Sequence, residues 1–420
     1  MRLEVLAEVT DGGATVHLLA RLEADASPAD ERPPINLALA IDRSSSMRGP
    51  RFAQAIRAAS QVVQRLDARD RLTILAFDGS VRVVFGPERV TPEAAARLAD
   101  LLGELDTGVG TNLAAAIKSG AERIRAGYVR GALSRLVLLT DGQPSVGLTD
   151  AEKLCSLVES EWENGVTVTA MGIGESFEDE LLAEMARRGR GGFHYLATPA
   201  DIPAAFGREL SGLFAIAATQ AELKLVPHEH VTAIDLLHRL PSRPLDDGLV
   251  VEVGEVASGA PRLVLFRIAR DPSSESRHLV TARLTYRTPD GRPGDASILG
   301  VELPRLPLGE ASRLVTLERF RLAVAAAVDQ AWARRAAGDR ERALGGLREV
   351  EAQLLAARAQ STFAAEEVEP LLADLAAAAD AVQRSAAERE KIKRRLRERS
   401  QVTLLGHSTL ARLPPIRDED

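Results

Sequence analysis

Two segments of the sequence place carboxylate and hydroxyl side chains directly after runs of apolar residues. Asp42, Ser44 and Ser46 occupy alternate positions that follow the apolar run 35–41, and Asp141 follows a second such run. Alternate side chains in a turn at the end of a strand can point into one small volume. The first segment can therefore offer three oxygen ligands to a cation, and the second adds a carboxylate.

A third segment is rich in glycine and opens a predicted helix. It reads Gly108-Val109-Gly110-Thr111-Asn112, and its threonine adds another hydroxyl. Carboxylate and hydroxyl oxygens are hard ligands, which suit Mg²⁺, or alternatively Mn²⁺ or Ca²⁺, rather than zinc or copper. Such a cation often keeps water, so one coordination position can stay open to a partner's carboxylate. The predicted metal ligands are Asp42, Ser44, Ser46, Thr111 and Asp141.

These segments need a sheet whose strands end at one edge. Four apolar-rich runs, at 35–41, 72–77, 136–140 and 166–172, alternate with patterns of helical period. The predicted helices span about 50–66, 92–105, 111–126, 149–163, 177–188 and 199–215. This alternation predicts an α/β fold with a doubly wound, mostly parallel sheet, which binds ligands at the carboxyl ends of its strands. Asp78-Gly79 predicts a tight hairpin that leads to an antiparallel edge strand at 81–85.

Strand patterns without helices flank this α/β segment. The alternation at 2–9 and 14–22 predicts an N-terminal hairpin that has no sheet of its own. Six further strands are predicted at 219–226, 231–238, 249–254, 261–268, 278–287 and 297–303. We therefore expect a β-sandwich built from residues 1–33 and 217–306, with the α/β domain of residues 34–215 inserted in it.

The C-terminal part is rich in Ala, Leu, Glu and Arg. Breaks at Gly338-Asp339 and Ser361-Thr362 predict about three helices, packed as a bundle over residues 310–400. The basic run Arg384–Arg399 is interpreted as a helix face that meets solvent or a protein partner. We expect residues 401–420 to form a flexible tail.

Composition excludes several classes of protein. The 420 residues are 45% hydrophobic and 27% charged, which excludes a disordered or collagen-like chain. A net charge of −7 argues against nucleic-acid binding, and the one cysteine, Cys155, is interpreted as a core residue. Apolar runs are too short for a transmembrane helix, and no secretion signal is recognised at the N-terminus. These features predict a cytoplasmic protein without membrane association.

The α/β segment resembles a von Willebrand factor type A (VWA) domain. Asp42, Ser44 and Ser46 match the Asp-x-Ser-x-Ser pattern of that family's metal-ion-dependent adhesion site (MIDAS), and Thr111 and Asp141 match its remaining positions. The resemblance implies that the three hydroxyls touch the metal directly and that the two carboxylates act partly through water. The flanking β segments resemble those of bacterial relatives of inter-α-trypsin-inhibitor heavy chains.

Together, these residues and this resemblance predict a non-enzymatic, divalent-metal-dependent module for protein–protein interaction. The cation would capture an Asp or Glu side chain of a partner, and Arg43, Ser45 and Gln143 would lie at the rim and tune selectivity. The helical segment would add an assembly surface, for self-association or for an ATPase-type machine. We also hypothesise that the last helix of the α/β domain, at 199–215, relays metal occupancy to the sandwich.

Two other functions stay as alternatives. A metal-dependent hydrolase would use the cation to polarise a phosphoryl or carbonyl group, with Asp78 or Asp106 as the base. In the second alternative the α/β domain is a scaffold, and the helical segment carries assembly. His228 and His230 are interpreted as the solvated end of a strand rather than as metal ligands.

Overall fold

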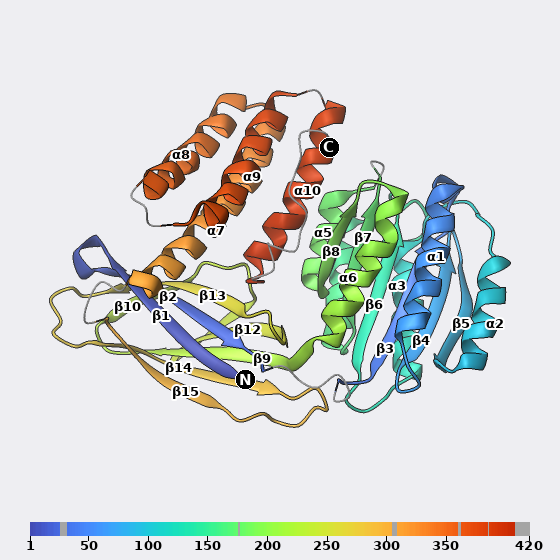
Figure 1. The fold of residues 1–420 in the computed structure, drawn as a ribbon, viewed down its shortest axis with the longest axis horizontal. Coiled ribbons are helices and arrows are strands. Elements are labelled where there is room, and N and C mark those ends of the chain that lie inside the picture. Colours follow the sequence, from blue (N-terminus) through green and yellow to red (C-terminus); the bar gives the residue numbers. More distant parts are fainter. Residues whose placement is uncertain (26–31, 175–176, 305–308, 360–362, 385, 408–420) are drawn as a thin grey trace. The chain divides into compact units, whose positions relative to one another are not determined.

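The chain folds into two compact units, one of α/β type and one built from antiparallel sheets and helices (Figure 1). The computed structural model describes residues 1–25, 32–174, 177–304, 309–359, 363–384 and 386–407. The α/β unit comprises residues 28–215 and 289–291, and the second unit comprises residues 1–27, 216–288 and 292–420. The predicted break at Ser361-Thr362 and most of the predicted tail lie outside the described residues.

A six-stranded sheet with the order β5-β4-β3-β6-β7-β8 forms the centre of the α/β unit. Its strands are β3 (Ile35–Asp42), β4 (Arg71–Phe77), β5 (Val81–Arg89), β6 (Leu133–Thr140), β7 (Thr167–Ile173) and β8 (Arg190–Leu196). Neighbours pair in parallel except β5, which is antiparallel to β4. The predicted mostly parallel sheet with one antiparallel edge strand is therefore confirmed. The sequence patterns did not predict β8, because Gly191 and Gly192 interrupt its apolar character.

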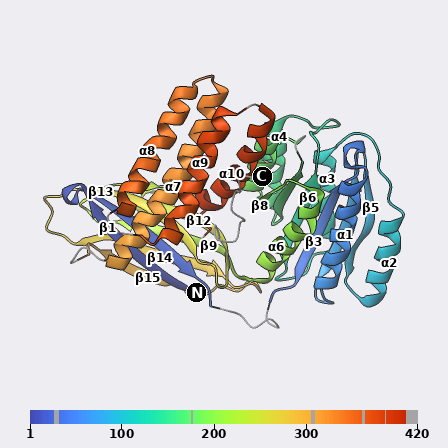
Figure 2. The same cartoon turned by 45° about the horizontal axis from the view of Figure 1, so that its top comes forward.

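Helices cover both faces of this sheet. They are α1 (Pro50–Arg65), α2 (Pro92–Gly103), α3 (Leu113–Ala126), α4 (Ala151–Glu163), α5 (Asp179–Arg188) and α6 (Ile202–Phe214). Helices α3, α4 and α5 share one apolar core with the sheet, whereas α1 and α6 contact each other on the opposite face (Figure 2). Every residue of β3 is buried, as expected for a central strand that is covered on both sides.

The second unit contains two antiparallel sheets. One has the order β1-β2-β13-β10 and the other has the order β11-β12-β9-β14-β15. The strands are β1 (Arg2–Thr10), β2 (Thr15–Glu23), β9 (Ile216–Pro227), β10 (Val231–Leu236), β11 (Ser242–Leu245), β12 (Gly248–Ala257), β13 (Arg262–Arg270), β14 (His278–Arg287) and β15 (Ser297–Glu302). Strand β2 pairs with β13, so the N-terminal hairpin joins strands more than two hundred residues away in the chain. Residues such as Leu18, Leu223 and Val251 from the two sheets share one core.

A helical bundle follows the sheets in the same unit. In the described part of the C-terminal region it contains α7 (Gly309–Ala336), α8 (Arg340–Ala359), α9 (Ala365–Gln383) and α10 (Ala386–Leu404). The prediction of about three helices was wrong, because the break near Arg384 falls inside a polar run that reads as continuous helix. Helix α7 packs on the outer face of the first sheet, where Val315 and Leu322 meet Leu19 and Leu265. Helix α10 extends four residues into the predicted tail, and residues 408–420 lie outside the described residues.

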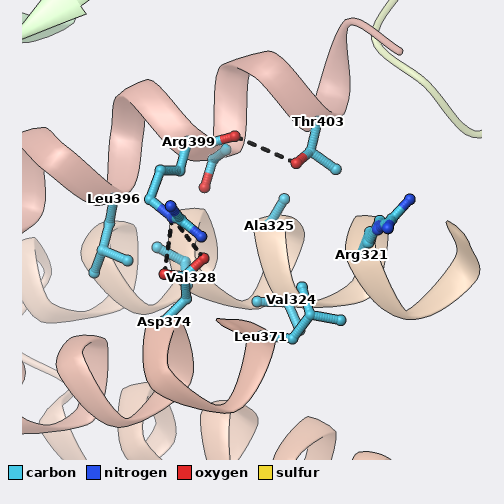
Figure 3. Close-up of a pocket in the computed structure, with 10 residues that line it drawn as sticks. Arg321, Val324, Ala325, Val328, Leu371, Asp374, Leu396, Arg399 and Thr403 are labelled. Atoms are coloured by element: carbon cyan, nitrogen blue, oxygen red, sulfur yellow. Dashed lines mark hydrogen bonds and ion pairs between the residues drawn. The ribbon is translucent and has the colours of Figure 1, made fainter. Parts of the chain in front are cut away.

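Helix α10 is more buried than its charge pattern predicts. Arg394 and Arg399 are both buried, and Arg399 Nε lies 2.9 Å from Asp374 Oδ1 of α9. Figure 3 shows this ion pair beside a small pocket between α7, α9 and α10. The interpretation of Arg384–Arg399 as a solvated face therefore fails for part of the run. None of the described helices is both long and apolar enough to cross a membrane.

Candidate metal centre

Asp42 ends the central strand of the α/β unit and is fully buried. Its two carboxylate oxygens each accept a hydrogen bond from an uncharged donor. The Ser44 backbone N–H donates to Oδ1 at 2.7 Å, and the Thr140 hydroxyl donates to Oδ2 at 2.5 Å. Thr140 reaches Asp42 because β3 and β6 are parallel neighbours with Ile41 beside Leu139. Local turn geometry and sheet register therefore fix the same carboxylate.

The two serines of the first segment connect Asp42 to Asp141. Ser44 Oγ lies 3.0 Å from Ser46 Oγ, and the Ser46 hydroxyl donates to Asp141 Oδ1 at 2.7 Å. Asp141 directly follows β6 and is fully buried. The structure thus connects four of the five predicted ligands through one continuous set of hydrogen bonds.

Thr111 joins the same cluster through the loop that follows Asp141. A Cβ atom placed on Gly142 would lie 3.3 Å from Thr111 Oγ1 and 3.9 Å from Ser46 Oγ, so both hydroxyls face this glycine. The Thr111 backbone N–H donates to Ser145 Oγ at 3.0 Å, and the Ser145 N–H donates to the Thr111 carbonyl at 3.0 Å. The next residue, Asn112, caps α3. All five predicted ligands therefore lie at the carboxyl edge of the sheet.

The electrostatics of the two carboxylates differ. Burial raises the pKa of the Asp42 carboxyl to about 6, although the hydrogen bonds from Thr140 and Ser44 lower it. Asp141 instead has a cationic neighbour, because Arg51 Nη1 of α1 lies 2.5 Å from Asp141 Oδ2. Arg51 Nη1 also donates to the Ser46 carbonyl at 3.3 Å. Asp42 thus accepts only from neutral donors, whereas Asp141 accepts from a hydroxyl and a guanidinium.

The donor set suits a hard divalent cation. Two buried carboxylates and three hydroxyls converge, and all of their donor atoms are oxygens. Among the described residues no group of three or more His, Cys, Asp and Glu side chains could hold a metal, so a zinc-type centre has no support there. Backbone carbonyls or water would have to complete the coordination of Mg²⁺ at this edge.

The predicted rim residues have different surroundings. Arg43 is partly buried and pairs with Asp78 at 2.8 Å and with Asp106 at 3.2 Å, whereas Ser45 and Gln143 are exposed. Sequence reasoning missed Thr140 and Arg51. The sequence places Thr140 at the end of a strand, and its hydroxyl at that position is the feature that could have indicated a contact with Asp42. Arg51 lies in the first turn of a helix, where the sequence indicates only an exposed side chain.

Two residues singled out elsewhere have structural roles. His228 directly follows β9 and stacks on His278 with ring centroids 5.4 Å apart. Cys155 is buried in the core of the α/β unit, and burial raises the pKa of its thiol to about 11. A thiol with that pKa is protonated at neutral pH and is a poor nucleophile.

The chain is similar to known proteins in sequence and in fold. The family model described as the von Willebrand factor type A domain matches residues 36–206. The uncharacterized protein sll0103 of Synechocystis is 26% identical over 290 residues, which cover 67% of this chain and 68% of that protein. The uncharacterized protein YfbK of Escherichia coli is 23% identical over 326 residues, which cover 71% of this chain and 55% of YfbK. The chain thus spans about half the length of YfbK.

More distant matches agree with this assignment. Inter-alpha-trypsin inhibitor heavy chain H4 of Sus scrofa is 26% identical over 157 residues, which cover 36% of this chain and 17% of that one. The solved structure titled von Willebrand factor type A from Catenulispora acidiphila has a TM-score of 0.69 at 16% identity and covers 96% of each chain. At that identity the match shows the fold alone. Residues 36–206 of the chain therefore match the von Willebrand factor type A (VWA) domain family.

Proposed function

We propose that this protein is a divalent-metal-dependent protein-interaction module. The cation is Mg²⁺, or alternatively Mn²⁺ or Ca²⁺, and it captures an Asp or Glu side chain of a partner protein. Its ligands are Asp42, Ser44, Ser46, Thr111 and Asp141. The observation that carries the proposal is the 2.7 Å hydrogen bond from Ser46 Oγ to Asp141 Oδ1, because it joins two oxygen-rich segments 95 residues apart in the chain.

The charges at the centre explain why a partner's carboxylate would need the cation. Arg51 pairs with Asp141, whereas the donors to Asp42 are an uncharged N–H and a hydroxyl. An incoming anion would therefore meet uncompensated negative charge. A bound divalent cation reverses the sign of that charge and turns the site into an anion receptor.

Binding, rather than catalysis, is the role we propose. VWA domains commonly serve as protein-interaction modules. Both candidate bases are engaged in ion pairs with Arg43, and the Asp78 carboxylate also accepts hydrogen bonds from the Ser80 N–H and hydroxyl. To act as a general base, either carboxylate would first have to leave its ion pair with Arg43. Metal-dependent hydrolysis of phosphate or acyl esters that disappears in Asp141→Asn would favour the hydrolase alternative.

The helical bundle is the proposed assembly surface, either for self-association or for an ATPase-type machine. Helix α8 exposes Leu355, a large apolar side chain. Removing the bundle is a poor test, because α7 covers Leu19 and Leu265 and its loss would expose the sheet core. Leu355→Glu keeps that core, and sedimentation of the variant and the wild type would reveal lost self-association.

The proposed function is tested by recovering partners in Mg²⁺ and eluting them with EDTA. Asp42→Asn keeps the shape of the side chain but removes one ligand charge, and Ser46→Ala removes one hydroxyl. Ser45→Ala is the matched control, because Ser45 is an exposed serine of the same turn that is not a predicted ligand. We expect capture to be lost in EDTA, in Asp42→Asn and in Ser46→Ala, and to persist in Ser45→Ala. Capture that is indifferent to chelator and to Asp42→Asn would refute the proposal.

A further inference from the structure

We infer that Arg51 is an internal counter-charge that competes with the divalent cation for Asp141 and lowers the metal affinity of the centre. This inference rests on the proposed metal site. The competing contact is short and direct, with 2.5 Å between Arg51 Nη1 and Asp141 Oδ2. Asp141 is fully buried, whereas 30% of the Arg51 side chain is exposed. The carboxylate is therefore fixed, and the guanidinium is the partner with room to move.

The start of α1 aims Arg51 at this carboxylate. Gly49 has φ +87°, a conformation that favours glycine, and Pro50 is the first residue of the helix. Arg51 thus lies in the first helical turn, five residues after Ser46, and its Nη1 also donates to the Ser46 carbonyl at 3.3 Å. One guanidinium group therefore bridges the serine turn and the second carboxylate.

The guanidinium fits beside Gly174 because a glycine has no side chain. A Cβ atom on Gly174 would lie 2.7 Å from Arg51 Nη2, so any larger residue there would displace the guanidinium. Gly174 has φ +77° and its N–H donates to the Leu196 carbonyl at 2.9 Å, which fixes the backbone after β7. Two features therefore determine where the Arg51 guanidinium lies: its contact with Asp141 and the space left by Gly174.

Competition follows from the limited capacity of Asp141. Its Oδ1 already accepts the Ser46 hydroxyl, and its Oδ2 accepts Arg51. If Arg51 stays in place, its positive charge lies a few ångströms from a dication and repels it. If Arg51 moves away, the ion pair with a buried carboxylate is lost. Both outcomes oppose metal binding, so Arg51 lowers metal affinity whichever way it responds.

The same pair should support the fold when no cation is bound. A buried carboxylate that loses its counter-charge destabilises the folded chain. Neutralising Arg51 should therefore have opposite effects on two measurable quantities: thermal stability in chelator falls, and metal affinity rises. If Arg51 merely held Asp141 in position, neutralising it would lower both the thermal stability and the metal affinity.

The inference is tested by titrating MnCl₂ into the full chain by calorimetry, after EDTA treatment and desalting. Arg51→Gln removes the charge, Arg51→Met provides a second neutral side chain if the glutamine variant fails to fold, and Arg51→Lys keeps the charge. Arg48→Gln is the matched control, because Arg48 is an exposed arginine just before α1 that donates to the Thr107 hydroxyl rather than to a predicted ligand.

We expect the neutral Arg51 variants to bind Mn²⁺ at least fivefold more tightly than the wild type, and Arg48→Gln to stay within twofold. The melting temperature of the neutral Arg51 variants in EDTA should fall below that of the wild type. Adding MnCl₂ should raise their melting temperature by more than it raises that of the wild type. Arg51→Lys should stay close to the wild type. Unchanged or weaker Mn²⁺ binding in both neutral variants would overturn the inference. A wild-type chain that binds no Mn²⁺ would instead refute the proposed metal site itself.

Discussion

The hydroxyl of Thr140 donates a 2.5 Å hydrogen bond to Asp42 Oδ2 across the two central strands of the α/β sheet. Both residues are fully buried, and both stand at the last position of their strand. The bond lowers the pKa of the Asp42 carboxyl, which burial raises to about 6. Thr140 thus keeps a buried carboxylate closer to the charged form that a cation needs.

Thr140→Val should destabilise the chain by about 1–3 kcal/mol, because it leaves a buried carboxylate oxygen without its donor. Metal affinity should fall as well, since more of Asp42 would be protonated near neutral pH. Urea unfolding in EDTA and MnCl₂ titration measure these two effects.

Thr73 provides the control for this prediction. It is a fully buried threonine of β4 whose Oγ1 has no hydrogen-bond partner among the described residues. Thr73→Val should therefore be neutral or stabilising. Equal losses of stability in the two variants would contradict the prediction that the Thr140–Asp42 hydrogen bond stabilises the folded chain.

The buried His17 should make the stability of the second unit decrease in acid. Burial, together with the charge of Arg319, lowers the pKa of His17 from 6.5 to about 4. Because the folded chain disfavours the protonated form, its stability is full above pH 6.5 and decreases as the pH falls toward 4. His17→Gln should remove up to about 2 kcal/mol of that decrease by pH 5. Urea unfolding at pH 7.5 and 5 checks this, and identical pH slopes in variant and wild type would contradict it.

The α/β unit should fold and bind metal when it is expressed alone as residues 32–215. Its two ends lie together, because the Arg32 guanidinium stacks over the Phe214 ring at 4.7 Å and also pairs with Asp70. Excision at these points therefore breaks few contacts within the unit. We expect cooperative urea unfolding and an Mn²⁺ affinity within threefold of the full chain. A fragment without a cooperative transition would show that the unit depends on the rest of the protein.

The central parts of the fold could be predicted because buried strands leave a strong pattern. The nearly continuous apolar run at 35–41 identified β3, and the alternation at 278–287 matched the bounds of β14. Edge strands carry weaker patterns. Strand β8 contains two glycines and β11 has only four residues, so neither could be recognised from periodicity. The additional helix had a similar cause, because the polar sequence around Arg384 contains no glycine or proline to mark the break.

The candidate site was predictable in its oxygen donors but not in their counter-charges. Spacing alone gave Asp42, Ser44 and Ser46, since alternate positions after a strand share a direction. The partners of these residues depend on sheet register and on helix orientation, which set the contacts of Thr140 and Arg51. No local pattern shows that an arginine in the first turn of a helix will meet a carboxylate 90 residues later. Such contacts follow only from the tertiary fold.

A crystal soaked in MnCl₂ tests the central claim most directly. The account predicts an anomalous peak at the carboxyl edge of β3 and β6, about 2.0–2.6 Å from the hydroxyl oxygens of Ser44, Ser46 and Thr111. The same peak should be absent from crystals of Asp42→Asn soaked in the same way. No peak at this edge in wild-type crystals at saturating MnCl₂, or an equal peak in both proteins, would contradict the account.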